Sequence, residues 1–148
     1  MLEEIHKELR EIAKLHDKFK RVLEALNEQA KQIIFALFFV KTKGRAIGDI
    51  ILYSHELFDV VLSFGDNTAK IYINARYSRD RIAEEVFRDE IPVKISYPEF
   101  NYPYLFDLLL FLKFGNEILE GLKKAKKEIS KSMSFVLDAV ESIKKRVE

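Results

Sequence analysis

Residues 58–77 read FDVVLSFGDNTAKIYINARY, and this stretch decides the fold class. Apolar and polar side chains largely alternate on both sides of the turn sequence Gly65-Asp66-Asn67-Thr68. A period of two is typical of a half-buried strand, and a Gly/Asp/Asn turn between two such runs predicts a β-hairpin. We therefore expect an antiparallel sheet near the middle of the chain.

The hairpin lies within a β-rich head, which we place at residues 44–103. Residues 46–53 predict a strand before the hairpin, and residues 91–97 predict one after it. Between them, Ser78 can cap a short helix at residues 79–89, because its hydroxyl can accept from a free N–H of the first turn. One apolar stripe supports this helix, and its members are Ile82, Ala83, Val86 and Phe87.

The head is flanked by two long segments, residues 1–43 and 104–148, in which apolar residues recur every 3.5 residues. This repeat is typical of a helix that packs along a partner helix. The first segment has apolar or small residues at Leu2, Ile5, Leu9, Ile12, Phe19, Leu23, Leu26, Ala30, Ile33, Leu37 and Val40. The second has them at Leu105, Leu108, Leu112, Leu119, Leu122, Ile129, Met133, Val136, Val140, Ile143 and Val147.

This order of elements predicts one α+β domain, residues 1–148. In it, the long N- and C-terminal heptad helices pack antiparallel, with a small antiparallel sheet and one short helix inserted between them. The heptad phase continues through Gly115, which favours one C-terminal helix, although Gly115 could also break it. The short apolar run 33–40 is compatible with a strand as well as a helix.

Composition and charge restrict the kind of protein. The 148 residues include 25 Lys and Arg against 24 Asp and Glu, so no net field points to nucleic acid. Glu and Lys are abundant while Cys and Trp are absent, a bias of thermophile proteins. No apolar run approaches the roughly 20 residues of a membrane helix, and the first residues do not resemble a signal peptide. We expect a cytoplasmic protein from a thermophilic source, with no membrane partner.

Catalytic and metal-binding motifs are weak. The sequence His55-Glu56-Leu57-Phe58-Asp59 is near the His-Glu-x-x-His zinc pattern, but it runs into a predicted strand rather than a helix. The carboxylates that could gather round a metal are Asp49, Glu56, Asp59 and Asp66, a set that is ordinary on the polar face of a sheet. We expect no enzyme, no cofactor and no metal.

Apolar and aromatic residues outside the heptad seams point to protein partners. Both long helices carry a second, weaker stripe, formed by Leu15, Val22, Phe135, Leu137 and Ala139. Such stripes favour a homodimer that assembles as a four-helix bundle. The connection after the last predicted strand is rich in aromatic residues, and we take Tyr97, Phe100, Tyr102 and Tyr104 as a candidate site for another protein or peptide. The alternative is a structural role, in which these residues pack the sheet onto the helices. The polar seam residues His16 and Lys126 are candidates for setting the helix register. The simpler alternative is that Lys126 extends out of the seam along its aliphatic stem and that His16 lies half-buried at the edge of the seam.

The alternative is a nucleic-acid-associated protein. Its candidate residues on the head are Tyr72, Arg76, Tyr77, Arg79 and Arg81, a set that could stack on bases and hold phosphates. Against it, the head carries slightly more acidic than basic residues. The order helix, β-rich head, helix resembles coiled-coil chaperones of the prefoldin type, and its strand and helix order resembles the small dimeric chaperones of secretion systems. We therefore favour a homodimeric protein-interaction, chaperone-like or scaffold protein.

Overall fold

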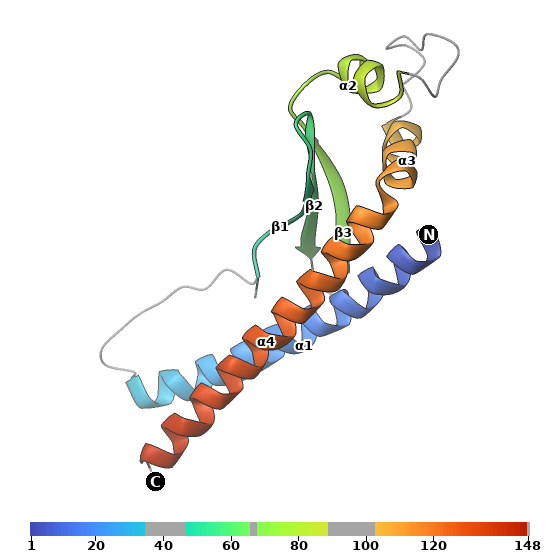
Figure 1. The fold of residues 1–148 in the computed structure, drawn as a ribbon. Helices are drawn as coiled ribbons and strands as arrows, with labels where there is room; N and C mark the ends of the chain where they lie inside the picture. Colours follow the sequence, from blue (N-terminus) through green and yellow to red (C-terminus); the bar gives the residue numbers. More distant parts are fainter. Residues whose placement is uncertain (35–46, 66–67, 89–102, 148) are drawn as a thin grey trace.

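The computed structural model describes residues 1–34, 47–65, 68–88 and 103–147, and these ranges form an α+β fold, as predicted. The predicted strand 91–97 lies outside them. Figure 1 shows two long helices with the sheet on one side of the pair. The two short helices lie beyond one end of this pair. In chain order the elements are α1 (Leu2–Ile34), β1 (Ile50–Ser54), β2 (Phe58–Gly65), β3 (Thr68–Ala75), α2 (Arg79–Val86), α3 (Pro103–Lys113) and α4 (Gly115–Val147).

The predicted hairpin is confirmed, with β2 paired antiparallel to β3 from Phe58 opposite Ala75 to Gly65 opposite Thr68. The sheet order is β1-β2-β3, so β2 is the central strand. Its side chains are buried on both faces up to Phe64. β1 begins four residues later than predicted, at Ile50, and its pairing with β2 has an irregularity between Ile51 and Tyr53.

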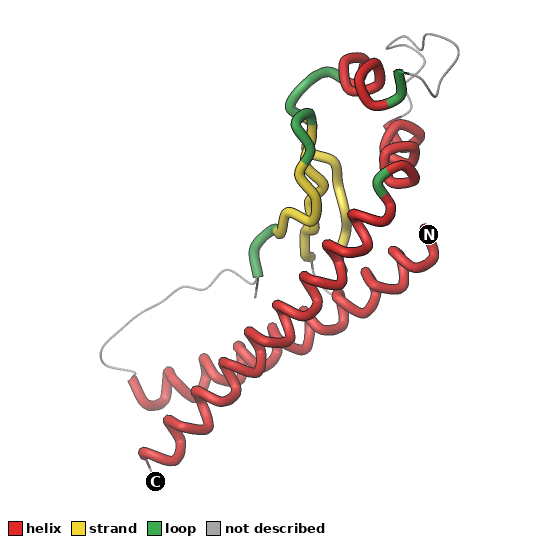
Figure 2. The backbone as a smooth tube through the Cα atoms, in the orientation of Figure 1, coloured by secondary structure: helices red, strands yellow, loops and turns green. Residues whose placement is uncertain are grey.

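The long helices pack side by side, but the prediction that they run antiparallel is wrong. The side chain of Met1 lies against Gly115 at the start of α4. Eleven residues further along α4, the Lys126 ammonium pairs with Glu8 and Glu11 of α1, at 2.9 and 2.7 Å. Because the contacts advance in the same direction along both helices, α1 and α4 are parallel, as Figures 1 and 2 also show.

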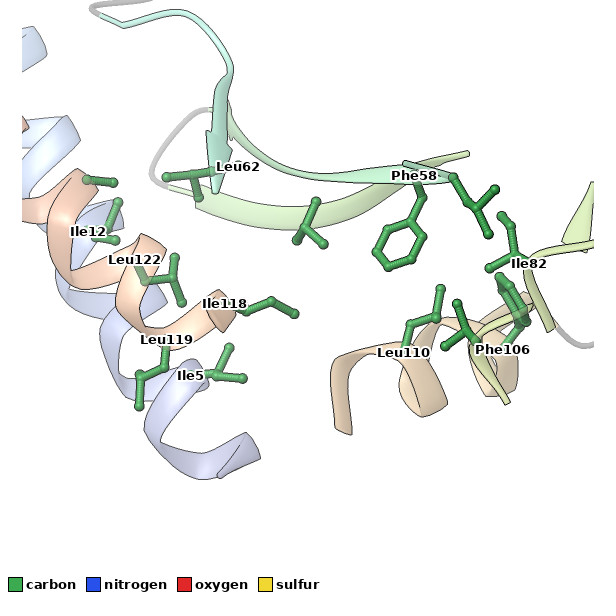
Figure 3. Close-up of a cluster of buried hydrophobic side chains, with 14 of the residues drawn as sticks. Ile5, Ile12, Phe58, Leu62, Ile82, Phe106, Leu110, Ile118, Leu119 and Leu122 are labelled. Carbon is green, nitrogen blue, oxygen red and sulfur yellow. The ribbon is translucent and has the colours of Figure 1, made fainter. Parts of the chain in front are cut away.

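The sheet lies across this helix pair, with β1 against α4 and β3 against α1. Its inner face buries Phe58, Val60, Leu62 and Phe64. The helices contribute to the same core (Figure 3), and their fully buried members include Ile12, Ile118 and Leu122. The sheet is therefore a third neighbour for the first halves of α1 and α4.

The C-terminal segment is two helices, so the favoured single helix is wrong. The interruption lies at Phe114, whose ring packs against Tyr53, His55 and Phe58 at centroid distances of 5.3, 5.6 and 5.4 Å. The next residue is Gly115, where a Cβ would lie 2.6 Å from Cγ of Met1. The missing Cβ of Gly115 therefore leaves room for the Met1 side chain at the point where the helix changes direction (Figure 1).

The short helix α2 begins where the sequence predicts it. The Ser78 hydroxyl accepts a hydrogen bond from the Arg81 N–H at 3.3 Å, and Ile82, Ala83 and Val86 are buried. The helix ends three residues earlier than predicted, at Val86. The Lys113 ammonium of α3 donates to the Val86 carbonyl at 2.6 Å and so ties the end of α2 to α3.

Candidate interaction surfaces

Arg76, the central basic residue of the predicted nucleic-acid site, is bound within the chain. Its guanidinium donates to both carboxylate oxygens of Asp59, at 2.7 and 2.8 Å, and to the His55 carbonyl at 2.9 Å. A hydrogen bond from Ser54 and the bonds from Arg76 hold the pKa of Asp59 below its ordinary value. Arg76 therefore closes the turn between β1 and β2, and its charge is compensated by a largely buried carboxylate.

The other members of that set also have partners within the chain. Arg81 lies over the Tyr77 ring, 4.0 Å from its centroid, and contacts Glu85 at 3.5 Å. Arg79 lies 5.8 Å from the centroid of the Phe106 ring. The Tyr72 hydroxyl donates to Asp49 at 3.2 Å. These partners reduce the positive charge and aromatic surface that a phosphate backbone or a base could contact.

The candidate metal ligands are dispersed. Within the described ranges, no group of three or more His, Asp or Glu side chains could hold an ion together. Asp59 is bound to Arg76, and Asp49 accepts from Tyr72. His55 accepts the Leu57 N–H through Nδ1 at 3.1 Å, so it lines a turn. Asp66 lies outside the described residues.

The two polar seam residues contact different parts of the fold. His16 is buried, and its ring stacks on Phe64 of β2 with a centroid distance of 4.2 Å and an interplanar angle of 6°. Lys126 is held by Glu11 and Glu8, and these hydrogen bonds raise the pKa of its ammonium. Lys126 therefore links α1 to α4, and His16 links α1 to the sheet.

Most of the aromatic connection lies outside the described residues, including Tyr97, Phe100 and Tyr102. Tyr104 lies in the first turn of α3. Beyond it, α3 carries an apolar surface that the sequence did not predict. The heptad positions Leu108 and Leu112 were expected in a buried seam, but they are 39% and 50% exposed.

α3 instead buries Phe106 and Leu110. The exposed side of α3 continues to Met1, which is 44% exposed and packs on Gly115 one turn after Leu112. We call Leu108, Leu112 and Met1 the α3 patch. Periodicity could not reveal it, because a heptad position does not specify which neighbour the helix meets.

The second apolar surface lies at the other end of the long helices, which continue past the sheet (Figure 1). We call residues 20–34 and 131–147 the arm. Phe135 of the arm is 75% exposed, and Leu137 is 40% exposed. Both belong to the second, weaker apolar stripe of the long helices, whereas Leu15, Val22 and Ala139 of that stripe are half-buried.

The apolar arc of the arm is wide. At about 100° per residue, the arc from Phe135 through Ala139, Val136, Val140 and Met133 to Leu137 covers roughly 200° of α4. One helical neighbour needs only a narrow seam. Nearer the head, where the sheet is a third neighbour, Leu122, Ala125 and Ile129 of α4 are at most 2% exposed. Within its described residues, the arm has no element that packs against both α1 and α4 as the sheet does nearer the head.

Comparisons with protein-family models, with curated proteins and with solved structures found no match for this chain. None of the helices in the described ranges is long and apolar enough to cross a membrane.

Proposed function

We propose that this chain is a homodimeric protein-interaction protein, in which the arm pairs with a second copy and the α3 patch meets another polypeptide. The observation that carries the proposal is the 75% exposure of Phe135 within a broad apolar arc. Large aromatic side chains contribute strongly to interface energy when they are buried at the centre of a contact. Two arms together could form a four-helix bundle, which covers the flank of α4 that carries Phe135.

Replacing Phe135 with glutamate tests the dimer. A charge at the centre of an apolar contact should weaken dimerisation at least tenfold, so F135E should elute as a monomer at concentrations where the wild type is a dimer. S134E is the matched control, because it places the same charge on the neighbouring exposed position of α4. The readout is the mass from light scattering after size exclusion.

The proposal is wrong if the wild-type chain stays monomeric at high micromolar concentration. In that case, F135E distinguishes between two explanations. A lower melting temperature of monomeric F135E would indicate that Phe135 is covered within one chain. An unchanged melting temperature would indicate an arm that no partner covers.

The α3 patch supports the second part of the proposal. Leu108 and Leu112 are one helical turn apart and both exposed, so they can receive apolar side chains of an unfolded segment. We expect the wild type to slow the aggregation of a chemically reduced model polypeptide, measured by light scattering. L112E should lose most of this effect, whereas N116E, one turn further along, should keep it. Equal protection by L112E and the wild type would contradict the assignment.

A further inference from the structure

We propose that the two copies cross antiparallel at Phe135 of α4, with Lys131 of each copy beside Asp138 of the other. The proposal rests on the homodimer proposed above and adds its direction and register. It commits to a second copy of this chain as the partner of the Phe135 face. The contact would be centred on Phe135 and would extend along α4 on either side of it, because the helices of a four-helix bundle cross at only about 20°.

The charges that flank Phe135 carry this inference. Lys131 precedes Phe135 by four residues and Asp138 follows it by three, and both are exposed. At about 100° per residue, the two lie within roughly 20° of each other on one side of the Phe135 face. A two-fold axis through the Phe135 contact reverses the helix but keeps that side, so Lys131 of one copy would lie level with Asp138 of the other, twice in each dimer.

A parallel pairing of the two α4 helices does not bring these opposite charges together. A two-fold axis along the helices carries the Lys131 side of one copy to the opposite flank of the contact, so Lys131 and Asp138 would face Ser132 and Ala139 of the other copy. The helix dipoles favour the antiparallel form as well. Since α1 and α4 of one copy run in the same direction, a reversed second copy places helices of opposite direction next to each other.

The other side of the Phe135 face has small side chains at matching positions. Ser132 and Ala139 lie within about 20° of each other on that side. The two-fold axis would place each small residue near the other copy's small residue or Phe135 ring. An aromatic ring can pack into the space above such residues. The complementary charges decide the register, and the small residues leave room for the two rings.

This arrangement places the two heads at opposite ends of the dimer. From Phe135 to Gly115 the helix rises about 30 Å at about 1.5 Å per residue, so the two ends at which α4 begins would be roughly 60 Å apart. The two α3 patches would then be widely separated. An elongated protein of this kind could hold two partner segments, or two regions of one polypeptide, at the same time.

Charge exchange tests the register. K131E alone should bring the introduced carboxylate next to Asp138 of the second copy, and D138K alone should bring the introduced ammonium next to Lys131. At low salt, where such pairs are least screened, we expect each variant to dimerise about tenfold more weakly. An equimolar mixture of the two should recover dimerisation as a 1:1 heterodimer, because both contacts then join opposite charges. K123E, on another face of α4, is the control.

The possible outcomes separate this proposal from the proposed function. Weak single variants that recover on mixing, measured by native mass spectrometry with one variant isotopically labelled, support the antiparallel register. If F135E is monomeric but K131E, D138K and their mixture dimerise like the wild type, the dimer stands and this register is wrong. If the wild type is itself monomeric, the homodimer fails, and the register fails with it.

Discussion

Replacing Gly121 with valine is expected to destabilise the protein by about 3 kcal/mol, the upper end of the range for overpacking a filled site. A Cβ on Gly121 would overlap the carbonyl oxygen of Leu52 and lie 3.0 Å from its carbonyl carbon. Both atoms are backbone, and the β1 residues on either side, Ile51 and Tyr53, are paired with β2. The strand therefore cannot move away from α4 without losing sheet contacts.

Urea unfolding of G121V measures this effect as a lower midpoint. G121A should lose less, because alanine favours a helix over glycine by about 1 kcal/mol and has no further methyl groups. Gly48 is the control position, since a Cβ there meets no atom within 4 Å. If G121V unfolds at the same urea concentration as the wild type, β1 does not pack on α4 as described.

Acidification is expected to weaken the fold through His16, and His16→Leu should remove that sensitivity. His16 is 3% exposed, and its Nε2 atom has no hydrogen-bond partner among the described residues. Burial lowers the pKa of His16, Lys20 lowers it further and Asp17 opposes them. The folded state therefore favours the neutral imidazole.

The direction of this pH effect on stability depends on whether the folded or the unfolded chain binds a proton at His16 more readily. In the unfolded chain, His16 binds a proton near pH 6.5, while the folded state resists it. The stability from neutral His16 is thus complete above about pH 6.5 and is lost as the pH falls toward the lower pKa of the folded state. Asp59, whose pKa is also lowered, adds acid sensitivity only below about pH 4.

Urea unfolding at pH 7.5 and pH 5 tests this account. We expect the wild type to lose more stability than H16L between the two values. At pH 7.5 we expect H16L to be more stable by about 1 kcal/mol, since it removes a buried polar atom without a partner at the cost of the ring stacking on Phe64. Exposed His6, changed to Gln, should leave the pH response unchanged. Equal pH dependence in the wild type and H16L would show that His16 is not the source of the acid sensitivity.

Local sequence signals predicted the elements well. The hairpin, with its last pair at Gly65 and Thr68, and the Ser78 cap depend on neighbouring residues, and the structure has them where the pattern indicates. The extent of β1 and α2 differed by a few residues, because strand pairing and the tie from Lys113 decide where these elements end. Such contacts are not encoded in a local pattern.

Long-range arrangement was harder to predict. A heptad seam specifies an apolar stripe, but it does not specify the direction of the partner helix, so parallel α1 and α4 could not be distinguished from an antiparallel pair. Leu108 and Leu112 continue the same repeat, yet α3 turns a different face, with Phe106 and Leu110, to the core. The gap that His16 leaves in the seam was visible, but its neighbour Phe64 is a strand residue that the repeat does not include.

Some of the candidate surfaces could be predicted from the sequence, and others could not. The second stripe pointed to Phe135 and Leu137 from the sequence alone, because apolar residues outside a seam are informative wherever the helix packs. The predicted basic and aromatic set was less informative, because its members have intrachain partners such as Asp59 and Glu85 that spacing does not reveal. The α3 patch required the structure, since its leucines look like ordinary seam residues.

Sedimentation equilibrium of the unmodified chain between about 1 and 100 µM tests the central claim most directly. The chain mass is 17.4 kDa. Pairing of the arms predicts a weight-average mass that rises with concentration to twice this value and then stays there. A mass that remains at 17.4 kDa throughout would contradict the homodimer.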